Sequence, residues 1–149
     1  LAPEIVTSAG HHAGADWWCL GILIYEMLAG YTPFYDERGT AEMFTRILSG
    51  KIYYPSSFSK EARDIISSLL QTKPTRRLGV LLGGADMIRN HPWFAGLDWD
   101  RLMRRELQAP IPINIANKFD LANFDVYQDE ENPNEPFVPD ADNPWDEVF

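Results

Sequence analysis

Residues 16–29 read DWWCLGILIYEMLA, and this stretch decides the fold. Large apolar side chains cover every face of it at helical spacing, which predicts a helix buried on all sides at the centre of the core. Gly30 occupies the position of a C-terminal glycine cap, and Pro33 follows shortly after it. Cys19, the only cysteine, lies within this run, so we expect a packed thiol and no internal disulfide.

Weaker amphipathic segments follow the central one. Gly50 is a suitable C-terminal cap for the first of them, and Ser59 is a suitable N-cap for the second. We find no convincing strand pattern, so we expect a mainly α fold. The predicted helices cover residues 41–48 and 60–70, a short segment that ends near His91-Pro92, and residues 99–107.

The chain changes character after Ala109. Six prolines exclude regular helix there and favour extended chain. Residues 120–149 hold 10 acidic residues and no Lys or Arg, whereas residues 1–119 are nearly neutral, with 13 basic and 12 acidic residues. The aromatic residues spaced along this segment indicate a tail that lies along another surface and anchors at intervals. We therefore expect a globular body followed by an extended tail.

Charge and composition argue against several classes of function. The net charge is -9, and the sequence has neither a basic stripe nor zinc-type spacing of Cys and His, so we expect no nucleic-acid partner and no metal site. The longest apolar run, residues 17–25, is about half of the roughly 20 residues that span a bilayer, so we expect no membrane partner. We expect an intracellular, cytoplasmic protein, with the nucleus as an alternative. An acidic surface suits basic peptides as partners.

Two carboxylates lie where charge is costly. Asp16 opens the central helix, and its simplest role is an N-cap that accepts from the free amides of the first turn. Glu26 lies within the apolar run, where an ionised carboxylate needs a partner unless it occupies an exposed edge of the helix. Both readings of Glu26 stay open at this point.

Several motifs resemble those of the protein kinase family in their order and spacing. The resemblance implies a C-terminal kinase lobe from the A-P-E segment onward, with residues 1–94 as a partial kinase domain, residues 95–149 as a tail of the AGC group, and no small β lobe. The end of the tail is similar to the cGMP-dependent kinases and the body to the cAMP-dependent ones. The motifs are Leu1-Ala2-Pro3-Glu4, Gly10-His11, Asp16-Trp17-Trp18-Cys19-Leu20-Gly21, Tyr25-Glu26-Met27, Gly30-Tyr31-Thr32-Pro33-Phe34, Arg77-Leu78-Gly79, His91-Pro92-Trp93-Phe94 and Asn123-Phe124-Asp125-Val126-Tyr127.

The resemblance assigns structural roles to three charged residues. It implies a buried ion pair between Glu4 and Arg77 that ties the end of the activation segment to the lobe. It also implies that Asp16 hydrogen-bonds the backbone of the catalytic loop, which precedes Leu1 in a kinase. In that role Asp16 orients catalytic residues without touching the substrate, as an alternative to the N-cap.

Three residues resemble parts of the substrate groove. Leu1 matches the position that lines the pocket for the residue after the phosphoacceptor. Glu26 matches the carboxylate that receives an arginine two residues before the phosphoacceptor, which implies basic, Arg-rich substrates. Tyr31 either supports this groove or is simply a turn aromatic that packs on the lobe.

The tail has matching positions of its own. Phe124 corresponds to the aromatic that closes over the adenine of ATP, and Tyr127 to one that reaches the active-site cleft, with plain anchoring against the small lobe as the less favoured alternative. Residues 76–149 contain no serine or threonine. We therefore expect the tail to dock through Trp145, Phe149 and fixed carboxylates rather than through phosphate.

The groups that transfer phosphate do not occur in this sequence. A kinase needs a glycine-rich loop, a paired lysine, a catalytic aspartate and a magnesium-binding aspartate, and all of them precede the A-P-E segment. We expect that the chain belongs to an ATP- and Mg²⁺-dependent serine/threonine kinase of the cyclic-nucleotide-regulated type, with a regulatory subunit or domain. The catalytic residues then lie upstream of Leu1, and the chain alone binds no cofactor. The alternatives are a non-catalytic module that binds substrates or regulators, and the C-terminal lobe of a pseudokinase.

Overall fold

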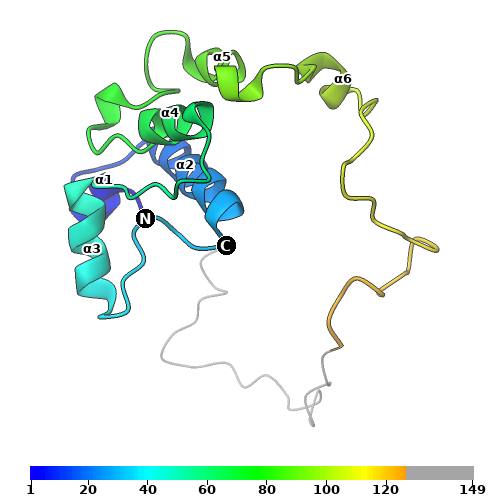
Figure 1. Cartoon of the computed structure of the whole chain (residues 1–149), viewed down its shortest axis with the longest axis horizontal. Coiled ribbons are helices and arrows are strands. Elements are labelled where there is room, and N and C mark those ends of the chain that lie inside the picture. Colours follow the sequence, from blue (N-terminus) through cyan, green and yellow to red (C-terminus); the bar gives the residue numbers. More distant parts are fainter. Residues whose placement is uncertain (127–149) are drawn as a thin grey trace, which may run out of the picture. The chain divides into compact units, whose positions relative to one another are not determined.

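The computed structural model describes residues 1–126 and is helical, with no strand among them (Figure 1). The chain forms two units, Leu1–Leu107 and Gln108–Phe149. The predicted mainly α fold class is confirmed, whereas the predicted boundary between residues 94 and 95 stays a prediction. The helices are α1 (Pro3–Val6), α2 (Gly14–Ala29), α3 (Thr40–Ser49), α4 (Lys60–Leu69), η1 (Pro74–Arg76), α5 (Gly84–Arg89), η2 (Pro92–Phe94) and α6 (Trp99–Met103).

The centre of the first unit is the pair α2 and α4, which pack against each other (Figure 1). The two helices approach closely at Gly21, because a Cβ atom there would lie 2.8 Å from Cδ2 of Leu70 and 3.0 Å from Cβ of Leu69. Only glycine permits this contact without displacing α4. The helix α2 ends at Gly30, whose φ of 80° gives the predicted left-handed cap.

Aromatic residues fill the space around α2. Trp18 is completely buried and stacks on Phe34 with 5.5 Å between ring centroids. Tyr25 packs against Phe58 at 5.1 Å, and its hydroxyl donates a 2.8 Å hydrogen bond to the carbonyl of Tyr53. These contacts join the loops on either side of α3 to the central helix, so the core extends well beyond the two packed helices.

The amphipathic helices form as predicted. The Oγ of Ser59 accepts a 3.1 Å hydrogen bond from the amide of Ala62, which caps the N-terminus of α4. Gly50 ends α3 with a φ of 63°. The apolar stripe of α4 is buried against α2, while its charged residues remain on the outside.

The prediction that the central helix is buried on all sides is wrong. On α2 the side chains of Leu23, Met27 and Leu28 are 50%, 65% and 47% exposed, and the thiol of Cys19 is exposed rather than packed. The reason is that α4 and the neighbouring loops cover one side of the helix, and none of the described residues covers the other. None of the helices within residues 1–126 is long and apolar enough to cross a bilayer.

The prediction that Asp16 is an N-cap is also wrong. The helix begins two residues earlier than expected, so Ala13 is the capping residue and Asp16 lies in the first turn with its side chain exposed. The free amide of Gly14 is instead satisfied by the ring Nδ1 of His12, at 3.0 Å. A histidine nitrogen therefore does at this end what the carboxylate was expected to do.

The last helix is shorter than predicted. Asp98 caps α6 through a 3.0 Å hydrogen bond from the amide of Arg101, but the helix ends at Met103 rather than near residue 107. Arg105 has a φ of 59°, which is incompatible with further helical turns. The described part of the second unit, residues 108–126, contains no helix and no strand, as the prolines predicted.

Candidate functional site

The backbone of the first residues is anchored to the core, whereas the side chain of Leu1 is exposed. Pro3 begins α1, which suits its lack of an amide proton, and Ala2 is completely buried in the core. Leu1 is 65% exposed. An apolar side chain is therefore presented to solvent immediately beside an anchored helix, and the role of Leu1 in a substrate pocket stays a prediction.

The anchor is an ion pair between Glu4 of α1 and Arg77, which follows η1. The two nitrogens Nη1 and Nη2 of Arg77 donate to the two carboxylate oxygens at 2.7 and 3.0 Å. Glu4 is 7% exposed and Arg77 is fully buried. The structure thus contains the ion pair that the kinase resemblance implied, in the bidentate geometry that makes such a pair strong.

Arg77 uses every donor that it has. Besides its two bonds to Glu4, Nη1 donates to the carbonyl of Gly14 at 2.6 Å. Nε and Nη2 both donate to the carbonyl of Gln71, at 3.2 and 3.0 Å. All five guanidinium hydrogens are satisfied, which offsets the cost of burying the charge. One side chain therefore joins α1, the start of α2 and the segment that follows α4.

The surroundings of this pair favour the charged form of both partners. The guanidinium lies 5.2 Å from the ring centroid of Trp18, close enough for a cation–π contact. The hydrogen bond from Arg77 lowers the pKa of Glu4 below its ordinary value, although burial acts in the opposite direction. The pair is therefore ionised at neutral pH.

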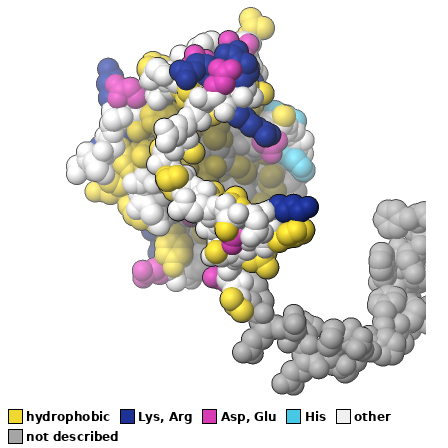
Figure 2. All heavy atoms as spheres, turned by 90° about the vertical axis from the view of Figure 1, so that its right-hand side faces the viewer, with side chains coloured by type: hydrophobic (Ala, Val, Ile, Leu, Met, Phe, Trp, Pro, Cys, Tyr) yellow, Lys and Arg dark blue, Asp and Glu magenta, His cyan; other side chains and the backbone are white. Residues whose placement is uncertain are grey.

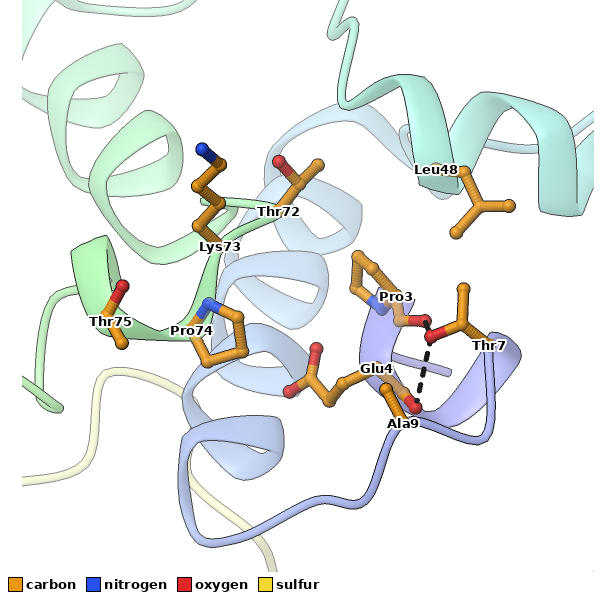
Figure 3. Close-up of a pocket in the computed structure, with 9 residues that line it drawn as sticks. All are labelled: Pro3, Glu4, Thr7, Ala9, Leu48, Thr72, Lys73, Pro74 and Thr75. Atoms are coloured by element: carbon orange, nitrogen blue, oxygen red, sulfur yellow. Dashed lines mark hydrogen bonds between the residues drawn. The ribbon is translucent and has the colours of Figure 1, made fainter.

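An open pocket of about 440 Å³ lies beside this junction (Figure 3). Its wall on the α1 side contains Glu4 and Thr7, whose hydroxyl donates to the carbonyl of Pro3 at 3.0 Å. The carboxylate of Glu4 is committed to Arg77, and the side chain of Lys73 extends away from Glu4 (Figure 3). The pocket thus offers no unpaired carboxylate, and Lys73 is the only basic side chain among the residues that line it.

Two of the predicted substrate residues lie at the C-terminal end of α2. Glu26 is exposed on the last turns of the helix and forms no ion pair with any residue in the described part of the chain. Tyr31 follows the cap, is 48% exposed, and packs edge-on against Tyr25 with 5.9 Å between centroids. A carboxylate that has no ion-pair partner within residues 1–126 can receive a basic side chain, and so can the exposed face of a tyrosine ring.

A second ion cluster, not predicted from the sequence, holds the loop between α2 and α3. The carboxylate of Asp36 is nearly buried and receives two guanidinium groups, from Arg38 and from Arg46 of α3, each at 2.8 Å. Arg46 also donates to the carbonyl of Tyr35 at 2.6 Å. The hydrogen bonds from Arg38 hold the pKa of Asp36 well below its usual range. An acidic residue two positions before one arginine and ten before another was the only sequence signal.

Asp16 and Phe124 are both exposed. The carboxylate of Asp16 accepts no hydrogen bond from any residue that the structure describes. Phe124, in the second unit, is 69% exposed. Tyr127, Trp145 and Phe149 lie outside the described residues. The assigned roles of all these side chains therefore remain predictions.

Hydrophobic side chains also reach the surface of the first unit. They include the uncovered side of α2 and the loop before α5, where Leu82 is fully exposed. Figure 2 shows hydrophobic side chains interspersed with basic and acidic ones on one face of the molecule. No cluster of three or more His, Cys, Asp or Glu suited to a metal ion occurs within residues 1–126.

Comparison with known proteins shows which family has this fold. The protein kinase domain family matches residues 1–94. The chain is 44% identical over 149 residues to the cAMP-dependent protein kinase catalytic subunit of Dictyostelium discoideum, covering 100% of this chain and 23% of that protein. It is 40% identical over 142 residues to the cAMP-dependent protein kinase catalytic subunit PRKX of Mus musculus, covering 95% and 40%. It is 42% identical over 133 residues to the serine/threonine-protein kinase YPK1 of Saccharomyces cerevisiae, covering 89% and 19%.

The chain belongs to the protein kinase family, which confirms the resemblance drawn from its motifs. It spans between 19% and 40% of the length of these three relatives. The helices, the absence of strands from residues 1–126 and the Glu4–Arg77 junction agree with a C-terminal kinase lobe. Identity alone does not separate the cAMP-dependent kinases from YPK1, because the value for YPK1 lies between the other two.

Proposed function

We propose that this chain is the base of the C-terminal lobe and the tail of an ATP-dependent serine/threonine kinase. The observation that supports this most is the uneven cover of α2, which is packed against α4 on one side and presents Leu23 and Met27 to solvent on the other. A monomeric domain rarely leaves large side chains of its central helix uncovered. In our proposal the preceding part of the kinase domain covers this side.

In this proposal the chain binds substrate, while residues outside it transfer the phosphate. Glu26 receives an arginine of the substrate, Leu1 contacts a hydrophobic residue after the phosphoacceptor, and Tyr31 supports the groove. The carboxylate of Glu26 supports this role because it is exposed and forms no ion pair within residues 1–126, and a charge-assisted pair with a guanidinium needs a free acceptor. Substrates are therefore basic peptides or proteins.

Asp16 acts in the same proposal as a support for the catalytic loop. Its carboxylate lies in the first turn of α2 and has no hydrogen-bond partner within residues 1–126, so both oxygens are free to accept from backbone amides elsewhere in a complete kinase domain. The Glu4–Arg77 junction fixes the carbonyl of Gly14 two residues earlier, which holds this turn in place. Asp16 is thus a positioning residue rather than a catalytic one.

We propose that the complete enzyme uses ATP and Mg²⁺, with Phe124 and Tyr127 contributing to the nucleotide site and Trp145 and Phe149 anchoring the tail. Phosphoryl transfer requires a lysine, a catalytic aspartate and Mg²⁺-binding groups in motifs that this sequence lacks, so no step of the reaction is assigned to its residues. The large exposed side chain of Phe124 supports a contact outside the second unit.

A cyclic-nucleotide-binding regulatory subunit or domain and an intracellular location complete the proposal. Two of the relatives are named as cAMP-dependent, which supports the regulatory partner. The single, exposed and unpaired Cys19 supports a reducing compartment. Retention on a matrix carrying a regulatory subunit, released by cAMP or cGMP, tests the first point and distinguishes the two nucleotides. Fractionation of cells tests the second.

The test is phosphate transfer from radiolabelled ATP by the protein expressed with the coding sequence upstream of Leu1. Two serine peptides are compared, one with arginine two residues before the serine and one with alanine there. We expect Glu26→Gln to lower kcat/KM for the arginine peptide by roughly 10- to 100-fold and to leave the alanine peptide nearly unchanged. Glu37→Gln is the control, because Glu37 is also exposed and its carboxylate accepts no hydrogen bond from a described residue.

The outcomes of this assay separate the alternatives. An equal loss for both peptides would remove Glu26 from arginine recognition. No transfer by a cooperatively folded protein would indicate a pseudokinase. An in-frame stop codon just before Leu1 in the transcript would favour a short, non-catalytic module that binds substrates or regulators.

A further inference from the structure

Asp120 holds together a turn in the second unit, residues 116–122. Its two carboxylate oxygens accept hydrogen bonds from amides on opposite sides of it in the sequence. The amide of Ala116 donates to Oδ2 at 2.7 Å, and the amide of Ala122 donates to Oδ1 at 2.9 Å. One side chain therefore closes a turn of seven residues, 116–122. Its bond to the amide two residues on is the usual way in which aspartate stabilises a turn.

Further hydrogen bonds extend this turn to Phe124. The amide of Asp120 donates to the carbonyl of Asn117 at 3.0 Å, and the side chain of Asn117 accepts from the amide of Phe119 at 2.9 Å. The amide of Phe124 donates to the carbonyl of Leu121 at 2.9 Å. These polar contacts define the backbone from residue 116 to residue 124, and the side-chain amide of Asn123 also donates to the carbonyl of Asn114 at 3.4 Å.

Apolar packing does not explain why this turn is formed. Phe119, Leu121 and Phe124 are 76%, 71% and 69% exposed, so the large side chains point away from the turn instead of filling it. Without Asp120, two amides at opposite ends of the turn would lose their acceptors. The carboxylate is therefore the group on which the shape of the turn depends, and the exposed rings depend on that shape for their direction.

The charge of Asp120 strengthens both bonds. Hydrogen bonds from backbone amides to an ionised carboxylate are about twice as strong as neutral ones. The same two bonds, first that from Ala116, lower the pKa of Asp120 below its ordinary value, so the carboxylate is charged at neutral pH. An asparagine has only one acceptor oxygen and can satisfy only one of the two amides.

We propose that Asp120 is a positioning residue that presets the turn carrying Phe124, so that this ring is presented to the adenine of ATP without a prior ordering step. The inference rests on the proposed contact between Phe124 and the nucleotide. A preformed turn removes the loss of affinity that arises when only a fraction of the molecules has the binding-competent conformation. Asp120 acts through the ring and does not touch the nucleotide.

The first test uses the 149-residue chain and measures amide hydrogen exchange by NMR. We expect Asp120→Ala to speed exchange of the Ala116 and Ala122 amides by at least about threefold, and Asp120→Asn to affect one of them. Asp100→Ala is the matched control, because Asp100 is exposed in the first unit and its carboxylate accepts no hydrogen bond from a described residue. Unchanged exchange at both alanines in Asp120→Ala would overturn the proposal.

The second test measures kcat and both KM values in the protein expressed with its upstream coding sequence. We expect Asp120→Ala to raise the KM for ATP about threefold to tenfold and to leave the KM for the peptide unchanged. Because Asp120 acts through Phe124, the double variant with Phe124→Ala should be no worse than Phe124→Ala alone. An additive effect of the two substitutions would contradict this.

The single variants distinguish the nucleotide contact of Phe124 from the positioning role of Asp120. If Phe124→Ala leaves the KM for ATP unchanged, the proposed nucleotide contact fails and the role of Asp120 fails with it. If Phe124→Ala raises this KM and Asp120→Ala does not, the nucleotide contact stands and Asp120 is not a positioning residue.

Discussion

Arg77 and Glu4, which lie 73 positions apart in the sequence, meet through two hydrogen bonds of 2.7 and 3.0 Å in the interior of the first unit. The remaining guanidinium hydrogens of Arg77 are taken up by the carbonyls of Gly14 and Gln71. The pair therefore joins three segments of the chain at one point. Its removal should affect the whole unit rather than a single loop.

Replacement of Arg77 by lysine should destabilise the first unit by about 3 to 5 kcal/mol. An ammonium group has three donors without the planar fork, so it cannot satisfy both Glu4 oxygens and both carbonyls, and a buried charge is left poorly paired. Urea unfolding followed by tryptophan fluorescence measures the change. Arg76→Lys is the control, because Arg76 is exposed and should change stability by no more than about 0.5 kcal/mol. An equal effect of both substitutions would contradict the role of the pair.

The contribution of Glu4 should depend on pH in a defined direction. Its pKa is lowered in the folded protein by the hydrogen bond from Arg77. Its stabilisation is therefore complete above the unfolded pKa of 4.5 and is lost as the pH falls through the lower folded value. The difference in unfolding free energy between the parent chain and Glu4→Gln should therefore shrink as the pH falls below 4.5. A difference that grows on acidification would contradict this.

Replacement of Gly21 by alanine should loosen the contact between α2 and α4. The new Cβ would lie 2.8 Å from Cδ2 of Leu70, and such overpacking costs about 1 to 3 kcal/mol. Alanine has a higher helix propensity than glycine, which stabilises the variant by about 0.8 to 1 kcal/mol. The net loss should therefore be about 1 kcal/mol, measured by urea unfolding. Cys19→Ala, on the exposed side of the same helix, should change little, and a stabilising Gly21→Ala would show that the close approach is unimportant.

Replacement of Asp36 by asparagine should release the loop that precedes α3. The amide oxygen can keep the hydrogen bond from the Arg38 amide, but the ion pairs to Arg38 and Arg46 are lost. Hydrogen exchange should become faster across residues 35–39, and the Tm should fall. Glu37→Gln should leave both unchanged, and the same result for Asp36→Asn would mean that the cluster does not order the loop.

Charged substitutions on the uncovered side of α2 should affect the stability of the 149-residue chain and of the longer protein differently. Leu23→Glu and Met27→Glu should leave the stability of the 149-residue chain within about 0.5 kcal/mol, because both side chains are at least half exposed in it. In the protein expressed with its upstream coding sequence, each should abolish cooperative folding, because an unpaired charge would be buried. Thermal melts of both forms make the comparison.

The helices were largely predictable from sequence because local signals set them. Gly30 and Ser59 mark their ends through backbone conformation and capping, which depend on neighbouring residues only. The ion pair of Glu4 and Arg77 was accessible only through the kinase resemblance, since no periodic pattern links residues so far apart. The capping nitrogen of His12 was missed because it is outside the usual set of capping side chains.

The faces of α2 that are buried could not be predicted from the composition of the helix. An apolar run shows which side chains avoid water, but the faces that are covered depend on where the other segments pack. Leu23 and Cys19 were therefore placed in the core, and both are exposed. The hydrogen bonds of Asp36 and Asp120 were not predicted for a related reason. The conformation of a loop determines which backbone amides and side chains reach these carboxylates.

The reactivity of Cys19 shows most directly whether the uncovered side of α2 is an interior surface of a kinase domain. Its thiol lies on the same stripe of α2 as Leu23 and Met27, and all three are exposed. Alkylation can be followed by mass spectrometry in the 149-residue chain and in the protein expressed with its upstream coding sequence. If the uncovered side of α2 is an interior surface of a kinase domain, Cys19 should react readily in the first and at least about 100-fold more slowly in the second. Equal reaction rates in the two folded proteins would contradict the claim.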